Sequence, residues 1–300
     1  MKRRLSDQRG SALLLVLWAL LLLSAAVFAW TASIQSDISR HAIENLSFEA
    51  ATMARSGIAI SLNPAVTRQT PIPDEELAPG MGFSVRVTSE GGKLNINWLL
   101  RGEEPMKLTI LKQWLERKGL DFAQREAFVD CLLDYVDADD VKRLNGAEDE
   151  GDYHPANREL RSVDELVRVK GSGPLISQPG WQDDLTVYSQ GPIDLSGASA
   201  EILSLLPGLG ETRIRQFVQY RQGSDGLDGT PDDKVFANLE EIQKFLGLSA
   251  AQFNSLNGLI TYNDPTVRII SEGRSGNLTR QIIVVARKGN MKPQILSWKE

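Results

Sequence analysis

Two loops of the sequence concentrate carboxylates in a pattern that could bind a metal ion. The first acidic loop (residues 137–152) and the second acidic loop (residues 223–233) each crowd several Asp or Glu residues into a short stretch. Such carboxylates repel one another unless something neutralises them. Calcium takes about six to eight oxygen ligands, and glycines let a loop fold around it. The sequence predicts bound calcium, with candidate ligands Asp137, Asp139, Asp140, Glu148, Asp149, Asp225, Asp228, Asp232 and Asp233.

The glycine-rich second loop is the better calcium candidate of the two. Neither loop is an EF-hand, because Val141 breaks the alternation of acids in the first and the acids of the second are unevenly spaced. The alternative is a pair of solvated acidic loops without an ion. Zinc is not expected, because neither His41 nor His154 has a Cys or His neighbour in the sequence.

The sequence contains no recognisable catalytic motif. It has no P-loop, no nucleophile elbow and no dinucleotide-binding glycine motif after a strand. Of the two histidines, His41 falls in a long helical pattern and His154 in an acidic stretch. The chain is therefore not expected to be an enzyme, and an anchored periplasmic enzyme is the least favoured function.

A helix-hairpin-helix pattern suggests a different chemistry. Residues 201–221 place a Pro-Gly-Leu-Gly turn, Pro207 to Gly210, between two helical segments, and Arg213, Arg215 and Arg221 follow it. DNA-binding hairpins of this type bind phosphate, which gives an alternative function: a DNA-handling minor pilin of a competence or pilus system. Against it, the chain has a net charge of −6. An acidic surface disfavours phosphate backbones, so no nucleic-acid partner is expected.

The N-terminus predicts a membrane anchor. Lys2, Arg3, Arg4 and Arg9 precede Gly10, and an uncharged apolar run then extends from Ser11 to Trp30. Twenty helical residues span about 30 Å, the thickness of the hydrocarbon core of a bilayer, and the run is too long for a secretory signal. The basic residues predict a cytoplasmic N-terminus with the bulk of the chain in the periplasm. An ordinary uncleaved anchor is the alternative to cleavage at Gly10.

The apolar run continues as a helical pattern. Apolar residues recur with a period near 3.6 from Ile34 to Ile60, and the first proline after the run is Pro64. A single long helix is therefore expected over residues 11–62.

Strand patterns flank a helical middle. Residues 81–89 alternate, with Gly91-Gly92 expected as the turn that follows, and the C-terminal region predicts three more strands. We expect a β domain over 63–100 and 265–300, interrupted by an inserted α-helical domain over 101–264. The insert contains two similar patterns, each a helix ending at a tyrosine, an acidic loop and a capped helix. Cys131, the one cysteine, lies in an apolar helical pattern and is expected to be a buried thiol.

Several stretches in this order resemble a known family. The stretch "QRGSALLLVLWALLLL" resembles the class III leader and helix of type IV pilins and pseudopilins. With "GKLNINWLL", "DYVDADD", "NRELRSVDELVRVKG", "VYSQGPIDLSGASAEILSLLPGL" and "ILSWKE", the chain is similar to minor pseudopilin K of type II secretion systems, also called general secretion pathway protein K.

The resemblance implies a fold, a location and partners. The fold would be α+β: a pilin-like fold, with a long N-terminal helix on a small antiparallel sheet, and a large inserted all-α domain. A prepilin peptidase would remove the leader (residues 1–10) after Gly10, and Ser11 would be methylated. The protein would cross the inner membrane once and join minor pseudopilins I and J and the inner-membrane assembly platform, at the tip of a periplasmic filament used for protein export. The family also binds calcium in the insert.

Leu15 departs from the usual pilin pattern. Typical pilins carry Glu at the fifth position after the cleavage site, where Leu15 stands. That carboxylate is thought to pair with the N-terminal ammonium of a neighbouring subunit. A carboxylate without such a partner is unfavourable in a bilayer. Leu15 therefore favours a subunit at the tip, above which no neighbour stacks.

Overall fold

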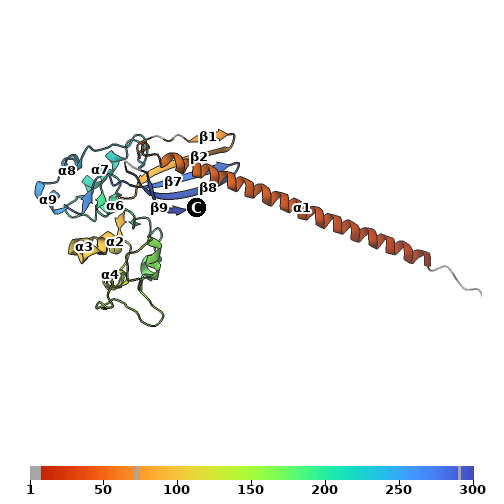
Figure 1. The fold of residues 1–300 in the computed structure, drawn as a ribbon, viewed down its shortest axis with the longest axis horizontal. Helices are drawn as coiled ribbons and strands as arrows, with labels where there is room; N and C mark the ends of the chain where they lie inside the picture. The colour runs from red at the N-terminus through yellow and green to blue at the C-terminus, as the bar shows by residue number, and fades with distance from the viewer. Residues whose placement is uncertain (1–7, 71, 73, 290–291) are drawn as a thin grey trace, which may run out of the picture.

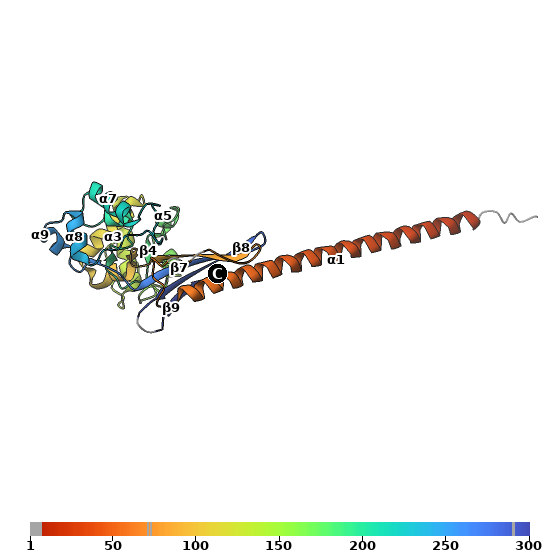
Figure 2. The same ribbon diagram turned by 90° about the horizontal axis from the view of Figure 1, so that it is seen from above.

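The computed structural model describes residues 8–70, 72, 74–289 and 292–300. Helix α1 (Gln8–Ser61) is a single continuous rod, which confirms the long helix expected from the sequence. Its residues 12–45 are exposed along their whole length, and only the C-terminal part of the helix packs against the rest of the chain. Figures 1 and 2 show α1 projecting far beyond the remaining fold.

A five-stranded antiparallel sheet covers the C-terminal part of α1. The strands lie in the order β1-β2-β7-β8-β9. Their bounds are β1 (Glu75–Ala78), β2 (Met81–Ser89), β7 (Thr266–Ser275), β8 (Leu278–Arg287) and β9 (Gln294–Lys299). Alternating residues such as Val87, Ile269 and Val284 pack with Ala54 and Ile58 of α1 in a small core. This arrangement confirms the expected pilin-like half of the fold.

Glycines allow the helix to approach the sheet closely. A Cβ atom at Gly273 of β7 would lie 2.0 Å from the backbone oxygen of Ala50, and one at Gly57 of α1 would lie 2.3 Å from Ser271 Oγ. Any side chain at either position would push the helix away from the sheet.

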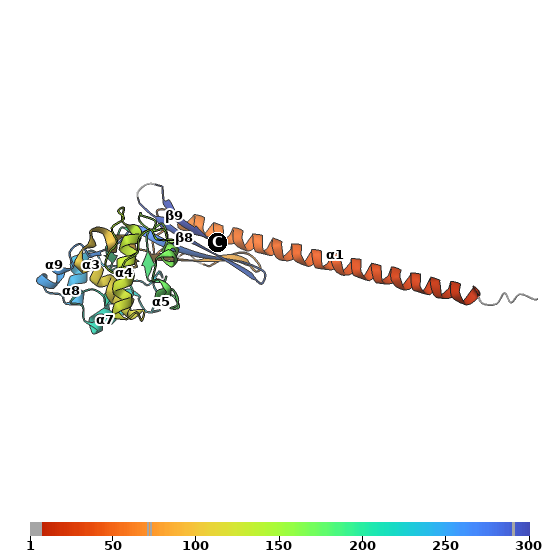
Figure 3. The ribbon, with the colours of Figure 1, turned by 90° about the horizontal axis from the view of Figure 1, so that it is seen from below.

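A large insert separates β2 from β7 and forms its own hydrophobic core. It lies at the end of the sheet remote from the exposed part of α1 (Figures 1 and 3). Its helices are α2 (Ile96–Leu100), η1 (Arg101–Glu103), α3 (Pro105–Arg117), α4 (Phe122–Val136), η2 (Val163–Arg168), α5 (Gly173–Ile176), α6 (Ala200–Leu203), α7 (Glu211–Arg221), α8 (Leu239–Leu246) and α9 (Ala250–Ser255).

The insert differs from the sequence prediction in two respects. It is not all helical, because β3 (Leu94–Asn95) pairs in parallel with β4 (Leu185–Thr186), and β5 (Ile193–Asp194) with β6 (Ile260–Thr261). It also begins before residue 101, since Leu94, Ile96 and Leu99 belong to its core rather than to the sheet's core. The start of the insert is defined by the core in which these residues are buried. The spacing of apolar residues in the sequence does not show which core that is.

The glycine pair after β2 is not a hairpin turn. A Cβ at Gly91 would lie 2.4 Å from Asp264 Cβ, and one at Gly92 would lie 2.3 Å from the carbonyl group of Gly197. The glycines therefore let the outgoing and returning segments of the insert pass one another closely.

Two buried carboxylates bind the insert to the sheet. Glu90 accepts hydrogen bonds from Nε and Nη2 of Arg268 on β7 at 2.7 and 2.9 Å and from Thr186 Oγ1 at 2.6 Å. Asp194 accepts from Ser89 Oγ at 2.9 Å and from the backbone N–H groups of Asn263 and Asp264 at 3.0 and 3.1 Å. Breaking such a buried network by removing one partner is strongly destabilising, so the insert is held firmly on the sheet.

The expected similarity between the two halves of the insert is partial. Asn238 caps α8 by accepting the Glu241 N–H, and Gly247 ends α8 in a left-handed conformation, as the pattern predicted. In the first half, Ser162 makes no side-chain cap, and the short η2 is a 3₁₀ helix. Glu165 instead accepts the backbone N–H of Arg161 at 3.2 Å.

Candidate functional site: a carboxylate cluster in the first acidic loop

Three carboxylates converge where the first acidic loop leaves α4. Asp134, Asp137 and Glu148 each offer one oxygen, and these oxygens lie within 4.8 Å of one another. Asp137 is the C-cap of α4, and its backbone N–H still bonds to the Leu133 carbonyl. The loop then returns so that Glu148 meets the end of the helix. Asp137 and Glu148 were both candidate ligands in the sequence.

Asp134 belongs to this cluster, but sequence reasoning missed it. It stands three residues before Asp137, so both side chains project from the same face of the last helical turn. Its side chain is fully buried. An acid inside the apolar stretch "CLLDYV" was the signal that could have identified it.

Glu148 is buried without hydrogen-bond donors. The residue is 8% exposed. Among the residues that the structure describes, neither carboxylate oxygen of Glu148 has a hydrogen-bond partner, and neither does Asp137 Oδ1. Burial, followed by repulsion from Asp134 and Asp137, raises the pKa of Glu148 above its ordinary value. Buried charges in proteins are normally paired or bound to a metal ion, so these oxygens are suited to a cation.

Arg143 partly neutralises the cluster. Its Nη1 donates to Asp134 Oδ1 at 2.6 Å and to Asp137 Oδ2 at 2.5 Å, and its Nη2 donates to Glu103 Oε1 at 2.6 Å. Burial opposes the charge on Arg143, but the hydrogen bonds to Asp137, Asp134 and Glu103 outweigh it and raise the pKa above its usual value. Arg143 therefore stays charged in the site.

The backbone of the first acidic loop passes close to the cluster. A Cβ at Gly146 would lie 1.9 Å from Asp134 Oδ2, so only glycine allows the backbone to pass this carboxylate. The neighbouring Asn145 donates its backbone N–H and its Nδ2 to Asp130 Oδ2 at 3.1 and 3.0 Å. Cys131, a buried free thiol as expected, contacts the Asn145 carbonyl at 3.4 Å. Side chains of α4 thus hold the loop at Asn145.

The remaining acids of the first loop do not join the cluster. Asp139, Asp140 and Asp149 are exposed. Asp139 Oδ1 accepts the Val141 N–H at 2.8 Å, which is a local turn interaction, and Asp149 Oδ1 lies 2.8 Å from His154 Nδ1. These three candidates from the sequence are therefore outside the converging set.

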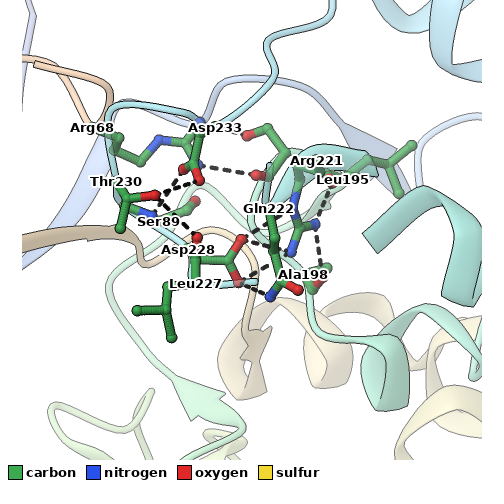
Figure 4. A network of polar contacts seen from close by, with 12 residues as sticks. Arg68, Ser89, Leu195, Ala198, Arg221, Gln222, Leu227, Asp228, Thr230 and Asp233 are labelled. Carbon is green, nitrogen blue, oxygen red and sulfur yellow. Dashed lines mark hydrogen bonds and ion pairs between the residues drawn. The ribbon is translucent and has the colours of Figure 1, made fainter. Parts of the chain in front are cut away.

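In the second acidic loop, Asp228 pairs with a buried arginine (Figure 4). Arg221 at the end of α7 is 3% exposed and donates Nη2 to Asp228 Oδ1 at 3.0 Å. Its Nη1 donates to the backbone oxygens of Leu195 and Ala198 at 3.0 and 2.8 Å. Burial lowers the pKa of Arg221, and Asp228 opposes that effect. The charge of Asp228 is thus balanced by the protein itself.

The other acids of the second loop are also supplied with donors. Asp232 Oδ2 accepts the Ser224 N–H and hydroxyl at 2.6 and 2.7 Å, and these bonds lower the pKa of Asp232. Asp233 Oδ2 accepts the Gly229 N–H at 2.8 Å, while burial raises the pKa of Asp233. Asp225 Oδ1 accepts the Leu227 N–H at 2.8 Å. The second loop therefore uses its carboxylates internally, and the ranking of the two loops as calcium sites stays a prediction.

The donor set of the first loop fits a calcium ion. Asp134, Asp137 and Glu148 provide hard oxygen ligands of the kind that calcium prefers, and one oxygen of each lies within 4.8 Å of the others. Two further observations support such a site. Buried oxygens of Asp137 and Glu148 lack donors among the described residues, and a side chain at Gly146 would collide with Asp134. In the second loop, an ion would have to displace hydrogen bonds that already satisfy the carboxylates.

The hairpin at Pro207–Gly210 joins α6 to α7 as a packing unit. Leu206 is buried in the insert's core, and Gly208 has φ of +81°, which suits the tight turn. Arg117 of α3 donates Nη1 to the Glu201 carbonyl at 3.3 Å and so holds the start of the hairpin against α3. The absence of a nucleic-acid partner remains a prediction.

The processing residues lie at the start of α1. Gly10 and Ser11 have helical backbone, whereas residues 1–7 of the expected leader lie outside the described residues. The described part of α1 contains one candidate membrane span, within Ala12–Ser61, with a mean hydropathy of 2.7 in its most apolar window. Leu15 is on this span and is 71% exposed. A single N-terminal anchor is therefore consistent with the structure.

Comparisons with known proteins match parts of this chain to secretion proteins. Residues 92–178 match the family described as type II secretion system (T2SS), protein K. The Type II secretion system protein K of Dickeya chrysanthemi is 35% identical over 69 residues, which cover 22% of this chain. The chain thus aligns with only 20% of that relative's length.

A solved structure matches the fold over most of the chain. A chain of the crystal structure of the GspK-GspI-GspJ complex from the enterotoxigenic Escherichia coli type 2 secretion system aligns with a TM-score of 0.60 and 14% identity. The alignment covers 88% of this chain and 98% of that one. At this identity the match shows a shared fold, consisting of the long helix, the antiparallel sheet and the helical insert.

Proposed function

We propose that the chain is a member of the protein K family of type II secretion systems and acts as a minor pseudopilin at the tip of the secretion pseudopilus. In this role it initiates or caps filament assembly for protein export across the outer membrane. The work is mechanical, and no catalytic activity is expected. The observation that carries the proposal is the placement of a bulky insert at the end of the sheet opposite the exposed part of α1 (Figure 1).

The shape of the molecule supports a terminal position. A subunit within a filament would stack its long helix beside those of its neighbours. The insert extends the fold beyond the end of α1, into the space that a subunit stacked above would need. Its buried attachments at Glu90 and Asp194 keep it from swinging aside. A cap tolerates this bulk, whereas a subunit within the shaft does not.

Leu15 supports the same position on grounds of charge. An apolar residue at the fifth position after Gly10 avoids a carboxylate that would need a neighbour's ammonium as its partner in the bilayer. We propose cleavage after Gly10 by the prepilin peptidase, methylation at Ser11, a cytoplasmic N-terminus and a periplasmic globular part. The inner-membrane assembly platform would then extract α1 from the bilayer as the filament grows.

The partners proposed for this chain are minor pseudopilins I and J of the same system. The crystal structure with the same fold is a complex of GspK with GspI and GspJ. In such a complex the exposed residues 12–45 of α1 would pack against the equivalent helices of the partners. Exposed apolar residues such as Leu17 and Ile38 would be covered there.

A calcium ion bound by Asp134, Asp137 and Glu148 is proposed to stabilise the insert. When bound, the ion would supply positive charge that neutralises the three carboxylates. Arg143 holds Asp134 and Asp137 in register, and Gly146 keeps the loop backbone close to Asp134. The ion would therefore fix the first acidic loop on the end of α4.

The tip position is tested by introducing a carboxylate at different positions in α1. In cells that lack their own protein K, Leu15→Glu is expected to let the subunit enter the filament shaft and to reduce secretion of exported proteins several-fold. Leu17→Glu is the matched control, because it introduces the same charge away from the fifth position. It is expected to reduce secretion without placing the subunit in the filament shaft. Immunogold labelling of sheared filaments locates the subunit. Unchanged secretion by Leu15→Glu, together with tip-only labelling, would refute the charge argument.

Processing is tested separately by the mass of the N-terminal peptide from membranes. A methylated peptide that begins at Ser11 is expected. A peptide that retains Met1, or one that begins near Ala29, would mean an ordinary anchor or a signal peptide instead.

A further inference from the structure

Arg143 occupies a distinctive place in the carboxylate cluster. Its Nη1 binds one oxygen of Asp134 and one of Asp137, at 2.6 and 2.5 Å. The other oxygen of Asp137 is buried and has no partner among the described residues. The other oxygen of Asp134 receives only a long contact of 3.3 Å from the backbone N–H of Arg143. Arg143 therefore neutralises part of the cluster, while Asp137 Oδ1 and both oxygens of Glu148 remain without a donor among the described residues.

The charges around the cluster can be counted. Asp134, Asp137 and Glu148 carry three negative charges when ionised, and arginine carries one positive charge at any accessible pH. The sum is two negative charges, which a divalent cation neutralises. Further charged groups lie on the outer side. Glu103, whose side chain is 54% exposed, binds Nη2 of Arg143, and Lys142 is 51% exposed. The exposed Asp139 and Asp140 act on Glu148 from a greater distance. Water screens charges at such exposed positions.

We propose that Arg143 is a specificity-determining residue of the cation site. It acts as an internal counter-charge that matches the three carboxylates to a divalent ion and disfavours a trivalent one. This inference rests on the proposed cation site. The physical reason is Coulombic: a fixed positive charge repels a trivalent ion half as strongly again as it repels a divalent ion at the same position.

The test compares two ions of similar size and different charge. Affinities of Ca²⁺ and Tb³⁺ are measured by calorimetry on the full-length protein in a non-ionic detergent, for the wild type and for Arg143→Gln. The ratio of Tb³⁺ affinity to Ca²⁺ affinity is expected to rise about tenfold in the variant, as estimated for a unit charge about 6 Å away at an effective dielectric constant of about 40. Loss of positioning alone would weaken both ions and leave the ratio unchanged.

Three control variants separate charge from shape. Arg143→Lys keeps the charge without the planar fork, so its ratio is expected to stay near that of the wild type while both affinities change. Lys142→Gln removes a neighbouring charge outside the cluster and is expected to change the ratio less than twofold. Glu103→Gln keeps Arg143 and removes the partly screened negative charge that contacts it, so the ratio is expected to fall, by less than the tenfold change expected for Arg143→Gln. This last variant tests the inference even if Arg143→Gln does not fold.

Each outcome has a distinct meaning. A higher ratio in Arg143→Gln, or a lower one in Glu103→Gln, supports the counter-charge. An unchanged ratio in both variants overturns it, and Arg143 is then a structural residue of the loop. If the wild type binds neither ion, the cation site itself is wrong and this inference falls with it, whereas the position of the subunit in the filament is unaffected.

Discussion

The first acidic loop holds Glu148 away from water without donors, whereas the second acidic loop surrounds Asp232 with hydroxyl and backbone N–H groups. The first loop turns Asp137 and Glu148 toward the end of α4, whereas its other candidate acids face solvent. The second loop uses Arg221 and its own backbone to neutralise them. The sequence density of acids is similar in both, so composition does not distinguish the two loops. The supply of hydrogen-bond donors does, and it favours the first loop as the proposed cation site.

The largest expected effect comes from removing Arg221, the positively charged side chain that pairs with Asp228 of the second loop. Arg221→Met is expected to destabilise the protein by about 3–5 kcal/mol, because the carbonyls of Leu195 and Ala198 would lose this donor and Asp228 would keep only Gln222. Chemical denaturation of the full-length protein in detergent measures the loss. The control is Arg215→Met on the exposed side of α7, which is expected to change stability by less than about 0.5 kcal/mol. Comparable losses in both variants would mean that the second loop does not depend on this arginine.

In the first loop, the corresponding test adds and removes a divalent ion. Calcium at about 100 times its dissociation constant should stabilise the wild type by about 2.7 kcal/mol, and Glu148→Gln should abolish most of that gain. In calcium-free buffer the same substitution should stabilise the protein by about 1 kcal/mol, because it removes a buried carboxylate that lacks donors. Thermal unfolding with calcium or with EGTA measures both effects.

The effect of Glu148→Gln on stability should change sign between the calcium buffer and the calcium-free buffer. Such a reversal is specific to a cation ligand. Asp232→Asn is the matched control, since its carboxylate already has donors and its calcium-dependent gain should equal that of the wild type. If Glu148→Gln destabilises the protein equally in both buffers, the first loop contains no functional cation ligand at this position.

Alanine substitutions at one glycine in each loop test the same difference, with smaller expected effects on stability. Gly146→Ala places a methyl group against Asp134 and should destabilise the protein by about 1–2 kcal/mol while abolishing calcium binding. Gly226→Ala in the second loop meets open space, but its φ of +69° disfavours any side chain, so a loss of about 1 kcal/mol is expected with calcium binding unchanged. Calorimetric titration with calcium distinguishes the two. Normal calcium binding by Gly146→Ala would contradict the proposed position of the ion.

Much of the fold was predictable from the sequence because its periodicities are strong. The unbroken apolar pattern before Pro64 gave α1, and the β-branched stretches near the C-terminus gave β7, β8 and β9. The start of the insert was placed too late, because the pattern of Leu94 to Leu100 does not say which core those residues enter. Gly91 and Gly92 looked like a turn, but they serve a close crossing of two segments that only tertiary structure creates.

The candidate site was predictable only in part for a related reason. Asp137 and Glu148 were found because acids are dense around them, yet density also pointed to Asp139, Asp140 and Asp149, which face solvent. Asp134 was missed because it stands in an apolar helix, where its spacing from Asp137 was the relevant signal. The role of Arg143 depends on a folded loop that brings it back to the helix end, and no local pattern encodes that contact.

The smallest expected effect is a difference in pH dependence between the loops. The hydroxyl of Ser224, with Thr230, lowers the pKa of Asp232, so its contribution to stability is present above the ordinary carboxyl pKa near 4 and is lost as the pH falls through the lowered value. Burial raises the pKa of Glu148, so in calcium-free buffer its ionisation destabilises the protein as the pH rises above the ordinary value. The two loops should therefore respond to acid with opposite signs.

Unfolding free energies between pH 7 and pH 3, in calcium-free buffer, measure this difference. The stability of the wild type relative to Asp232→Asn should stay constant down to about pH 5 and then shrink, whereas its stability relative to Glu148→Gln should improve as the pH falls. Asp225→Asn, which removes a carboxylate that accepts one backbone N–H in the same loop, should give a smaller difference at every pH. If both main differences moved in the same direction, the two loops would not differ in how they neutralise their carboxylates, because only a carboxylate rich in donors gains from staying ionised in the folded state.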